Sequence, residues 1–325
     1  MWFIWSHTVV ALLGEGYEVI ILDNLSNSKI AVLDAIQTVT WKTPLFYQGD
    51  IRDTHLLAHI YTTHHIEGVV HFAAQKAVGE SCTDPRAYYS SNIFGIHELT
   101  KTMHAFGCKK IIFSSSCTVY DPLASQAPFS ESAPLGNCFS PYGTTKYVSE
   151  LLLRDLHLHQ WFSALNLRYF NPIGAHSSWL LVEDPAQSPT NLLPVIFQVL
   201  QWKRPYLEIF GETYDTPDGT CLRDYIHVVD LAEAHVAGRK RLENQQEPTL
   251  EPINIWTGTP TSVKELVAIT QEVTTQSVEV RIVDARPWDV PIAYAQTKKA
   301  HDLLWWSAKK SVVDAVHDWW RFITK

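Results

Sequence analysis

The feature that most constrains the fold is a regular alternation of short apolar runs with longer helical patterns over the first half of the chain. Five runs have the length and composition of β-strands: Glu18–Leu22, Pro44–Tyr47, Gly68–Phe72, Lys109–Ser114 and Ser163–Leu167. Helical periodicity lies between them, as in 92–105 and 142–156. Strands that alternate with helices form a parallel sheet with helices on both faces. The sequence therefore predicts an α/β fold with a Rossmann-type doubly wound parallel sheet.

The second half of the chain has more proline, longer loops and one further helical stretch at Thr261–Thr274. We expect residues 1–167 to form a nucleotide-binding domain and residues 168–325 to form a smaller α/β substrate part built on it. Met1–Leu13 is apolar, but it lacks the basic start and the small-residue cleavage site of a signal peptide. It runs directly into Gly14 and a strand pattern, so we expect a core helix.

Charge and cysteine content exclude several classes of protein. The 325-residue chain has a net charge of −8, which disfavours nucleic acid and anionic membranes as partners because both need a basic face. The five cysteines are odd in number and form no CxxC pair, and the fifteen histidines are scattered. We therefore expect no disulfide framework, no bound metal and a reducing, cytoplasmic location. No apolar run approaches the roughly 20 residues that span a bilayer.

The strongest chemical signal is a Tyr-x-x-x-Lys pattern, Tyr142 to Lys146, at the start of a helical segment. Four-residue spacing puts both side chains on one helix face, one turn apart. A phenol is a weak base at neutral pH because its pKa is about 10, and a nearby ammonium favours the phenolate. Ser116 follows the strand at Lys109–Ser114 and is expected to hold a substrate hydroxyl. We therefore predict that Tyr142 is a general base assisted by Lys146 and Ser116. A buried tyrosine beside a solvated lysine is the alternative.

Asp23 points to the cofactor. It ends the apolar strand Val19–Leu22 and lies eighteen positions after Trp5. A carboxylate about 20 residues after a phosphate-binding loop reaches the adenosine ribose of NAD, and it would repel the 2′-phosphate of NADP. The sequence therefore predicts NAD, with an aspartate that only starts a turn as the alternative.

Several segments in the same order give the chain a resemblance to the UDP-glucose 4-epimerases, which belong to the extended short-chain dehydrogenase/reductases. The resemblance runs from Phe3 to Trp306 and is carried by Asp23–Ser28, Gly49–Asp53, His71–Ser81, Arg168–His176, Asn191–Pro194 and Arg223–Val228. It implies that the following residues contact NAD: Phe3, Ile4, Asp23, Asn24, Asn27, Ser28, Asp50, Ile51, Phe72, Ala73, Lys76, Asn92, Tyr142, Lys146 and Tyr169. It makes 1–167 the NAD-binding domain and 168–325 the UDP-sugar-binding part.

The same resemblance implies a UDP-hexose substrate, bound by Ser116, Asn171, Asn191, Leu192, Arg223, Tyr225, Arg286, Asp289 and Ala293. Within this set, Arg223 and Arg286 resemble the arginines that hold the diphosphate, and Asp289 resembles the uridine-ribose contact. Bidentate guanidinium contacts suit a diphosphate better than a lysine does. For both arginines a surface ion pair is the alternative.

The resemblance implies reversible C4 epimerisation of UDP-glucose and UDP-galactose in galactose metabolism, by a homodimer with tightly bound NAD. Tyr142 is expected to take the O4 proton while the C4 hydride passes to NAD, and the 4-keto sugar turns before the hydride returns. Another epimerase or dehydratase of the family is one alternative, although Ser116–Tyr120, where Cys117 precedes Thr118, lacks the acidic pair that dehydratases commonly carry after this threonine. A catalytically impaired sugar-nucleotide-binding protein is another.

Ala293 is the residue expected to set the range of sugars. It aligns with a position where a large tyrosine limits family members to simple hexoses. An alanine there leaves space at the C2 substituent, so we expect N-acetylated UDP-hexoses to be accepted as well. A register slip of one residue would place Tyr294 at this position instead.

Tryptophan stands at seven positions where the resembled family has glycine: Trp2, Trp5, Trp179, Trp202, Trp256, Trp288 and Trp305. An average glycine share of about 7% would give roughly 23 glycines, whereas the chain has 14. Because random decay would not select one replacement, we hypothesise a reassigned stop codon that the cell reads as glycine and this sequence reads as tryptophan. The start is also expected to lack the first strand and first loop glycine. A chain with tryptophan at positions 2 and 5 is expected to bind NAD poorly, because an indole would occupy the space beside the pyrophosphate.

Overall fold

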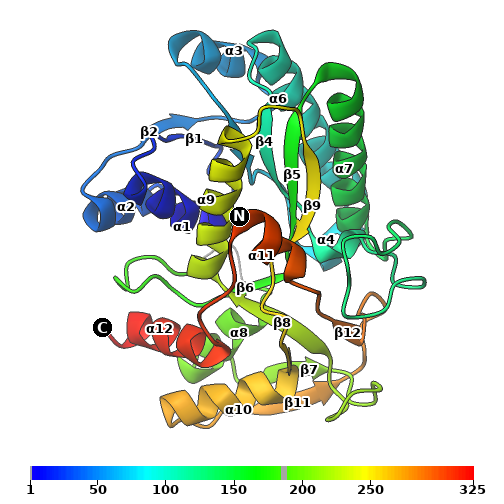
Figure 1. The fold of residues 1–325 in the computed structure, drawn as a ribbon. Helices are drawn as coiled ribbons and strands as arrows, with labels where there is room; N and C mark the ends of the chain where they lie inside the picture. The colour runs from blue at the N-terminus through cyan, green and yellow to red at the C-terminus, as the bar shows by residue number, and fades with distance from the viewer. Residues whose placement is uncertain (1, 184–188) are drawn as a thin grey trace.

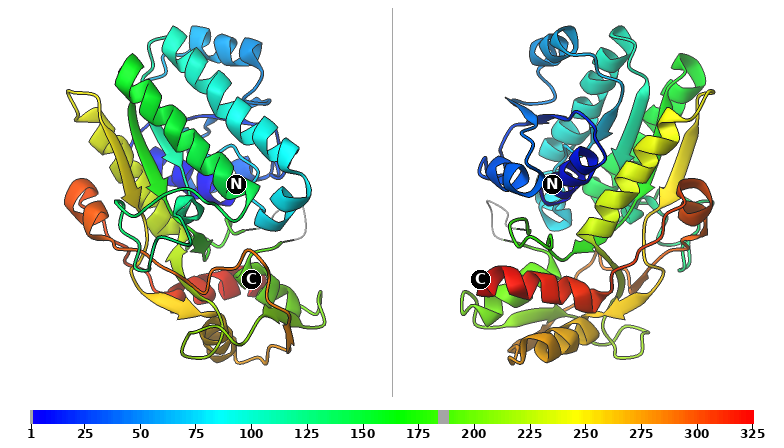
Figure 2. Two further views of the ribbon diagram at one scale, coloured as in Figure 1. Left: turned by 90° about the vertical axis from the view of Figure 1, so that its right-hand side faces the viewer. Right: turned by 60° about the vertical axis from the view of Figure 1, so that its left-hand side comes forward.

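The computed structural model describes residues 2–183 and 189–325. Its main sheet has four parallel strands in the order β3-β4-β5-β9. These strands are β3 (Val69–His71), β4 (Lys110–Ser114), β5 (Ser163–Arg168) and β9 (Leu250–Asn254). Helices cover both faces of the sheet, as Figure 1 and Figure 2 show. They include α3 (Thr54–Thr63), α6 (Phe94–Ala105), α7 (Pro141–Gln160) and α9 (Val228–Glu243). The predicted α/β class with a doubly wound parallel sheet is confirmed.

A second parallel pair stands apart from this sheet. Strands β1 (Ile20–Asp23) and β2 (Leu45–Gln48) are joined by α2 (Val32–Thr40), and among the described residues β1 pairs only with β2. A cavity of about 1560 Å³ lies between the two sheets and is lined by residues 20–22 of β1 and 69–71 of β3. The parallel sheet is therefore divided at this cavity.

The first helix is a core element. Helix α1 (Trp2–Gly14) packs against α9, and Phe3, Ile4, Val9 and Leu13 are buried in the cluster between the sheet and these helices. Figure 1 shows α1 lying beside α9. This confirms the prediction of a core helix for the apolar start. Among the described helices, none is long and apolar enough to cross a membrane.

The rest of the chain forms a lower part around β8 (Leu222–His227), which pairs with β6 (Asn171–Ile173), β10 (Pro260–Ser262) and β12 (Ile292–Ala293). A parallel pair, β7 (Leu207–Phe210) and β11 (Val280–Val283), lies beside it with α8 (Leu192–Leu200), α10 (Val263–Thr274) and α12 (Val312–Thr324). Two short helices, α4 (Val78–Thr83) and α5 (Pro85–Tyr88), precede α6, and α11 (Lys298–Leu304) precedes α12. The chain returns to the main sheet through α9 and β9, so both parts of the predicted division after residue 167 contribute to that sheet. The division itself stays a prediction.

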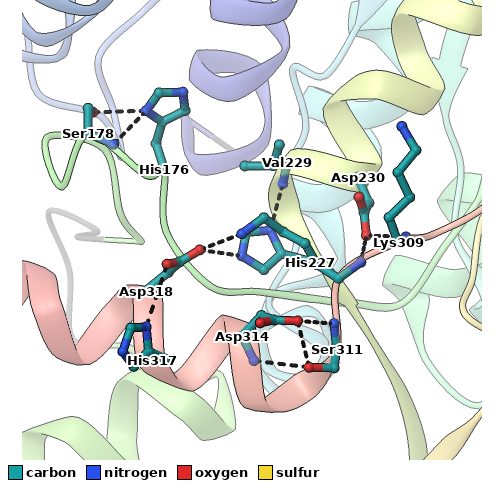
Figure 3. Close-up of polar contacts among 11 residues, drawn as sticks. His176, Ser178, His227, Val229, Asp230, Lys309, Ser311, Asp314, His317 and Asp318 are labelled. Carbon is teal, nitrogen blue, oxygen red and sulfur yellow. Dashed lines mark hydrogen bonds and ion pairs between the residues drawn. The ribbon is translucent and has the colours of Figure 1, made fainter.

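Polar contacts at the end of β8 join this strand and the start of α9 to α12, as Figure 3 shows. The His227 side chain caps α9 by accepting from the Val229 amide at 3.1 Å, and its Nε2 lies 3.3 Å from an Asp318 carboxylate oxygen of α12. Gly174, with φ of +95°, packs against this ring, and a Cβ there would lie only 2.7 Å from His227 Nε2. The junction fixes the end of the strand that carries Arg223 and Tyr225.

Candidate active site

The predicted reactive residues gather at the carboxyl end of β4 and in the first turns of α7. Ser140 caps α7 by accepting from the Gly143 amide at 3.2 Å, and Pro141 begins the helix. Tyr142 and Lys146 follow one turn apart, and they are 8% and 2% exposed. Ser116, two residues after β4, is also buried. The alternative of a solvated lysine is therefore wrong.

Lys146 is held by the strand it faces. Its Nζ donates to the Ser114 carbonyl at 2.6 Å and lies 5.9 Å from the centroid of the Tyr142 ring. Burial lowers the pKa of Lys146 to about 7, although Glu150 opposes the shift. The ammonium is therefore close to losing its proton at neutral pH.

The Tyr142 phenol has two opposing influences. Burial raises its pKa, and the Ser116 hydroxyl lowers it. Ser116 Oγ accepts from the Thr118 amide at 3.2 Å and from Thr118 Oγ1 at 3.0 Å, which leaves its own proton to donate toward the phenol. The sequence predicted that Lys146 lowers the pKa of Tyr142. In the structure the low dielectric of the buried site dominates, and the pKa is raised instead.

Two further predicted cofactor residues, Asn92 and Tyr169, form hydrogen bonds close to this group. Asn92 lies in a π-helical turn, Tyr89–Ile93, where its amide bonds to both backbone groups of Gln75 and donates to Thr145 Oγ1 at 3.0 Å. The Tyr169 hydroxyl is hydrogen-bonded to Ser114 Oγ. Both were predicted to contact the cofactor, and in the structure both brace the strand ends and α7.

Most of the predicted cofactor residues line the cavity between the sheets. They are Asp23, Asn24, Asn27, Ser28, Asp50, Ile51, Phe72, Ala73 and Lys76. Phe3 and Ile4, in contrast, are 2% and 5% exposed in the hydrophobic core of α1. The predicted cofactor contacts between residues 23 and 76 therefore lie together on the surface of one cavity.

Hydrogen bonds from neighbouring groups hold the two carboxylates on this surface, Asp23 and Asp50, in place. Asp23 Oδ1 accepts from the Ser28 hydroxyl and the Leu25 amide, both at 2.7 Å. Two hydrogen bonds from Arg52, both 2.8 Å, hold the Asp50 carboxylate and lower its pKa to about 2 despite burial. Asn27 Oδ1 is buried and has no hydrogen-bond partner in the part of the chain that the structure describes. Carboxylates, amides and an unpaired acceptor suit the hydroxyl and base edges of a dinucleotide.

Trp5 does not fit a dinucleotide bound on this surface. Its indole Nε1 donates to Asp23 Oδ2 at 3.0 Å, and the ring lines the cavity. The indole therefore takes the carboxylate oxygen that the ribose of a dinucleotide is expected to use. The predicted contacts that line the cavity fit NAD.

The predicted diphosphate and ribose contacts also come together. Asp289 accepts two hydrogen bonds from Arg286, at 2.8 and 3.0 Å, and lies 3.9 Å from Arg223. Two guanidiniums around one carboxylate leave one positive charge uncompensated, which suits an anion. Arg223 is buried beside the face of Phe170.

Other predicted substrate residues surround this pair. Asn171 pairs with Tyr225 between β6 and β8, and its Nδ2 is buried without a partner among the described residues. Ala293 pairs with Arg223 between β12 and β8 and is 4% exposed, in a cluster with Cys117 and Trp256. Asn191 and Leu192 form the start of α8.

Sequence reasoning missed Glu183, which links the two halves of the site. One carboxylate oxygen accepts from Lys76 Nζ at 3.0 Å and from Asn191 Nδ2 at 2.5 Å. Its side chain is only 4% exposed, and it lines the cavity. An acid directly after the apolar run 180–182 is the signal that could have identified it, because such a residue is rarely buried without a partner.

A second missed group lies beneath Lys146. Glu150, one turn farther along α7, accepts from Arg168 at 2.6 and 3.0 Å and from Ser115 Oγ at 2.5 Å. All three side chains are buried. The pair joins α7 to β5 and to the residue before Ser116, so it orients the helix that carries Tyr142.

Comparison with known proteins places this geometry in context. Residues 3–255 match the NAD dependent epimerase/dehydratase family. A UDP-glucose 4-epimerase from Bacillus subtilis (strain 168) is 44% identical over 322 residues, which cover 98% of this chain and 94% of that protein.

Solved structures give the same result. The UDP-glucose 4-epimerase from Bifidobacterium longum in complex with NAD+ and UDP superposes with a TM-score of 0.95 at 39% identity, covering 99% of this chain and 95% of that one. The UDP-glucose-4-epimerase from Stenotrophomonas maltophila, with bound NAD and formylated UDP-arabinopyranose, gives a TM-score of 0.94 at 40% identity and covers 98% and 94% of the two chains.

Proposed function

The chain belongs to the NAD dependent epimerase/dehydratase family, and we propose that it interconverts UDP-glucose and UDP-galactose by inverting C4 of the hexose. One observation carries the proposal: buried Ser116, Tyr142 and Lys146 gather at the end of β4 and the start of α7, in the fold shared with NAD-bound epimerases. The protein is an NAD-dependent epimerase that acts on a UDP-sugar.

Proton transfer belongs to Tyr142. The phenolate takes the proton from O4 of the sugar and returns it in the second half of the reaction. NAD, when bound, would supply the redox chemistry, because its nicotinamide can take up a hydride from C4 and return it. Ser116 has a single proton to donate, and it turns from the phenol to O4 when the sugar binds, so it orients the hydroxyl that loses its proton. Lys146 supplies positive charge that favours the phenolate once the site is loaded.

NAD is held along the cavity between the sheets. Asp23 and Ser28 would bind the adenosine ribose, Asp50 and Ile51 would contact the adenine, and Lys76 would reach the nicotinamide ribose. Support for this arrangement comes from their shared position on one cavity surface. A carboxylate at the adenosine ribose favours NAD over NADP.

The UDP group is held by the lower part of the molecule. Arg223 and Arg286 bind the diphosphate, with the Asn171 and Asn191 amides beside them, and Asp289 accepts from the uridine ribose. A substrate held by its diphosphate leaves the hexose free to turn. The 4-keto sugar can therefore present either face to the cofactor.

Glu183 positions both halves of the site. Its carboxylate accepts from Lys76 on the cofactor side and from Asn191 on the diphosphate side. One acidic residue thus sets the spacing between the two ligands. Because it touches neither reacting atom, we assign it a positioning role.

The proposal is tested by conversion of UDP-galactose to UDP-glucose without added NAD or any other oxidant or reductant. Enzyme with resident NAD is expected to reach the same product ratio from either sugar. A requirement for stoichiometric NAD, or release of a dehydrated sugar, would contradict it. We also propose a cytoplasmic homodimer that binds no nucleic acid. The family resemblance supports the dimer, the cysteine pattern supports the compartment, and the net charge of −8 disfavours nucleic acid; sedimentation of the purified protein tests the dimer.

A further inference from the structure

Five tryptophans adopt a backbone conformation that residues with a Cβ rarely adopt. Trp41, Trp161, Trp179, Trp202 and Trp305 have φ of 57°, 62°, 58°, 59° and 53°. Among the described residues only Leu25, Asn137 and Thr275 are other non-glycine residues with positive φ. The left-handed region is sterically unfavourable for L residues, and bulky residues there are outliers. Trp41 and Trp161 are not among the tryptophans that the family resemblance aligns with glycine, and only their φ angles identify them.

Four of these residues follow the end of a helix. Trp41 ends α2, Trp161 ends α7 and Trp305 ends α11, and their amides donate to carbonyls of the last turn, at Gln37, Leu156 and His301. Trp202 follows α8 and donates to the Val199 carbonyl at 2.9 Å. A left-handed residue that closes a helix in this way is usually glycine.

The indoles at these helix ends contribute almost no packing. Trp41, Trp202 and Trp305 are 90%, 91% and 88% exposed, and Trp161 is 66% exposed. Such exposure is unusual for a large aromatic side chain.

Other tryptophans in the chain behave differently. Trp306 is 5% exposed and donates to the Asp230 carbonyl at 3.1 Å, and Trp319 is 4% exposed and stacks on Phe197. Neither has positive φ. Trp306 and Trp319 therefore pack, whereas the four helix-end tryptophans are exposed at positions whose backbone conformation favours glycine.

We infer that positions 41, 161, 179, 202 and 305 are glycine in the functional protein, and that one codon, decoded as glycine in the cell, accounts for them. Glycine removes the left-handed strain at each position and loses no buried contact at the exposed ones. One replacement type at five separate turns is expected from a single decoding rule. Independent mutations would give varied residues.

Position 5 extends the inference to the cofactor site, and this part rests on the proposed function. The Trp5 indole donates to Asp23 Oδ2 at 3.0 Å and is 7% exposed, so it fills space beside the predicted ribose contact. Glycine at position 5 would free that oxygen and open the cavity there. We infer that position 5 is decoded by the same rule.

Matched substitutions test the backbone argument. W41G, W202G and W305G combined are compared with W41A, W202A and W305A combined. Both triple variants remove the exposed indoles, but only glycine removes the Cβ from the left-handed region. The glycine triple is expected to melt higher than the alanine triple by roughly 3 °C or more. Equal melting temperatures would overturn the claim that these positions are built for glycine.

Peptide mass spectrometry of the protein isolated from its own cells tests the decoding directly and independently of the proposed epimerase activity. Peptides covering positions 5, 41, 161, 179, 202 and 305 are expected to carry glycine, whereas Trp306 and Trp319 remain tryptophan. Tryptophan at the helix-end positions would overturn the inference.

The cofactor part has its own variants. W5G is expected to retain more NAD after purification than the parent chain. W5F keeps an aromatic ring but loses the indole donor, and it is expected to stay near the parent. Equal NAD content in W5G and W5F would overturn the steric role of position 5. If W5G does not fold, the residue found at position 5 in the native peptide decides the matter.

Discussion

The buried Lys146 predicts an unusual dependence of stability on pH. Burial lowers the pKa of Lys146 from 10.5 to about 7 in the folded protein. Between these values the unfolded chain holds a proton that the folded protein has lost. The free energy of unfolding should therefore rise with pH from about 7 toward 10.5, by about 1.4 kcal/mol for each pH unit from this residue.

Lys146→Met isolates this contribution. Methionine has a similar length and no charge, so the variant should lack the Lys146 slope while other titrating groups remain common to both proteins. Between pH 7.5 and 9.0 the wild-type protein should gain about 2 kcal/mol relative to the variant. Urea unfolding at several pH values measures the difference, and any constant offset from the lost hydrogen bond to Ser114 cancels in the slope. Parallel pH profiles for the two proteins would refute the reasoning.

Three further substitutions probe the site. Tyr142→Phe should lower kcat by at least roughly 100-fold while UDP binding is kept, because only the proton-transfer group is lost; near-normal turnover would defeat the assignment. Glu183→Gln should raise KM for the UDP-sugar and loosen NAD while changing kcat little, with Glu183→Asp partly restoring both; unchanged ligand affinities would remove Glu183 from the positioning role. Ala293→Tyr should reduce turnover of UDP-N-acetylglucosamine more than that of UDP-glucose, as nucleotide-sugar chromatography can measure; equal losses would point to a different register.

The reactive residues could be predicted because their chemistry is local in sequence. Tyr142 and Lys146 are one helical turn apart, and Asp23 ends a strand whose apolar pattern is visible in the sequence. Their burial follows from the same periodicity that predicts the helix and the sheet. The α/β class followed from the alternation of strands and helices.

Contacts between distant segments could not be predicted. Glu183 meets Lys76 across 107 positions, and neither residue has a local pattern that names its partner. The return of α9 and β9 to the main sheet depends on packing beyond any short window. The raised pKa of Tyr142 likewise follows from burial, which the sequence alone does not quantify.

The helix-end tryptophans are residues whose unusual backbone conformation could be seen only in the structure. Sequence resemblance selected Trp202 and Trp305, but Trp41 and Trp161 were identified only when the backbone angles were known. A left-handed C-cap is a property of the folded backbone, and tryptophan gives no indication of it because its own preferences oppose that conformation.

Epimerisation by return of the same hydrogen to C4 is tested most directly with UDP-galactose deuterated at C4. The enzyme is incubated with this substrate in ordinary water, and the UDP-glucose formed is examined by NMR. If the hydrogen leaves C4 to resident NAD and comes back while Tyr142 handles only the O4 proton, the product should keep deuterium at C4. Loss of the label to solvent would contradict the account, because it would require a proton to be removed from carbon instead.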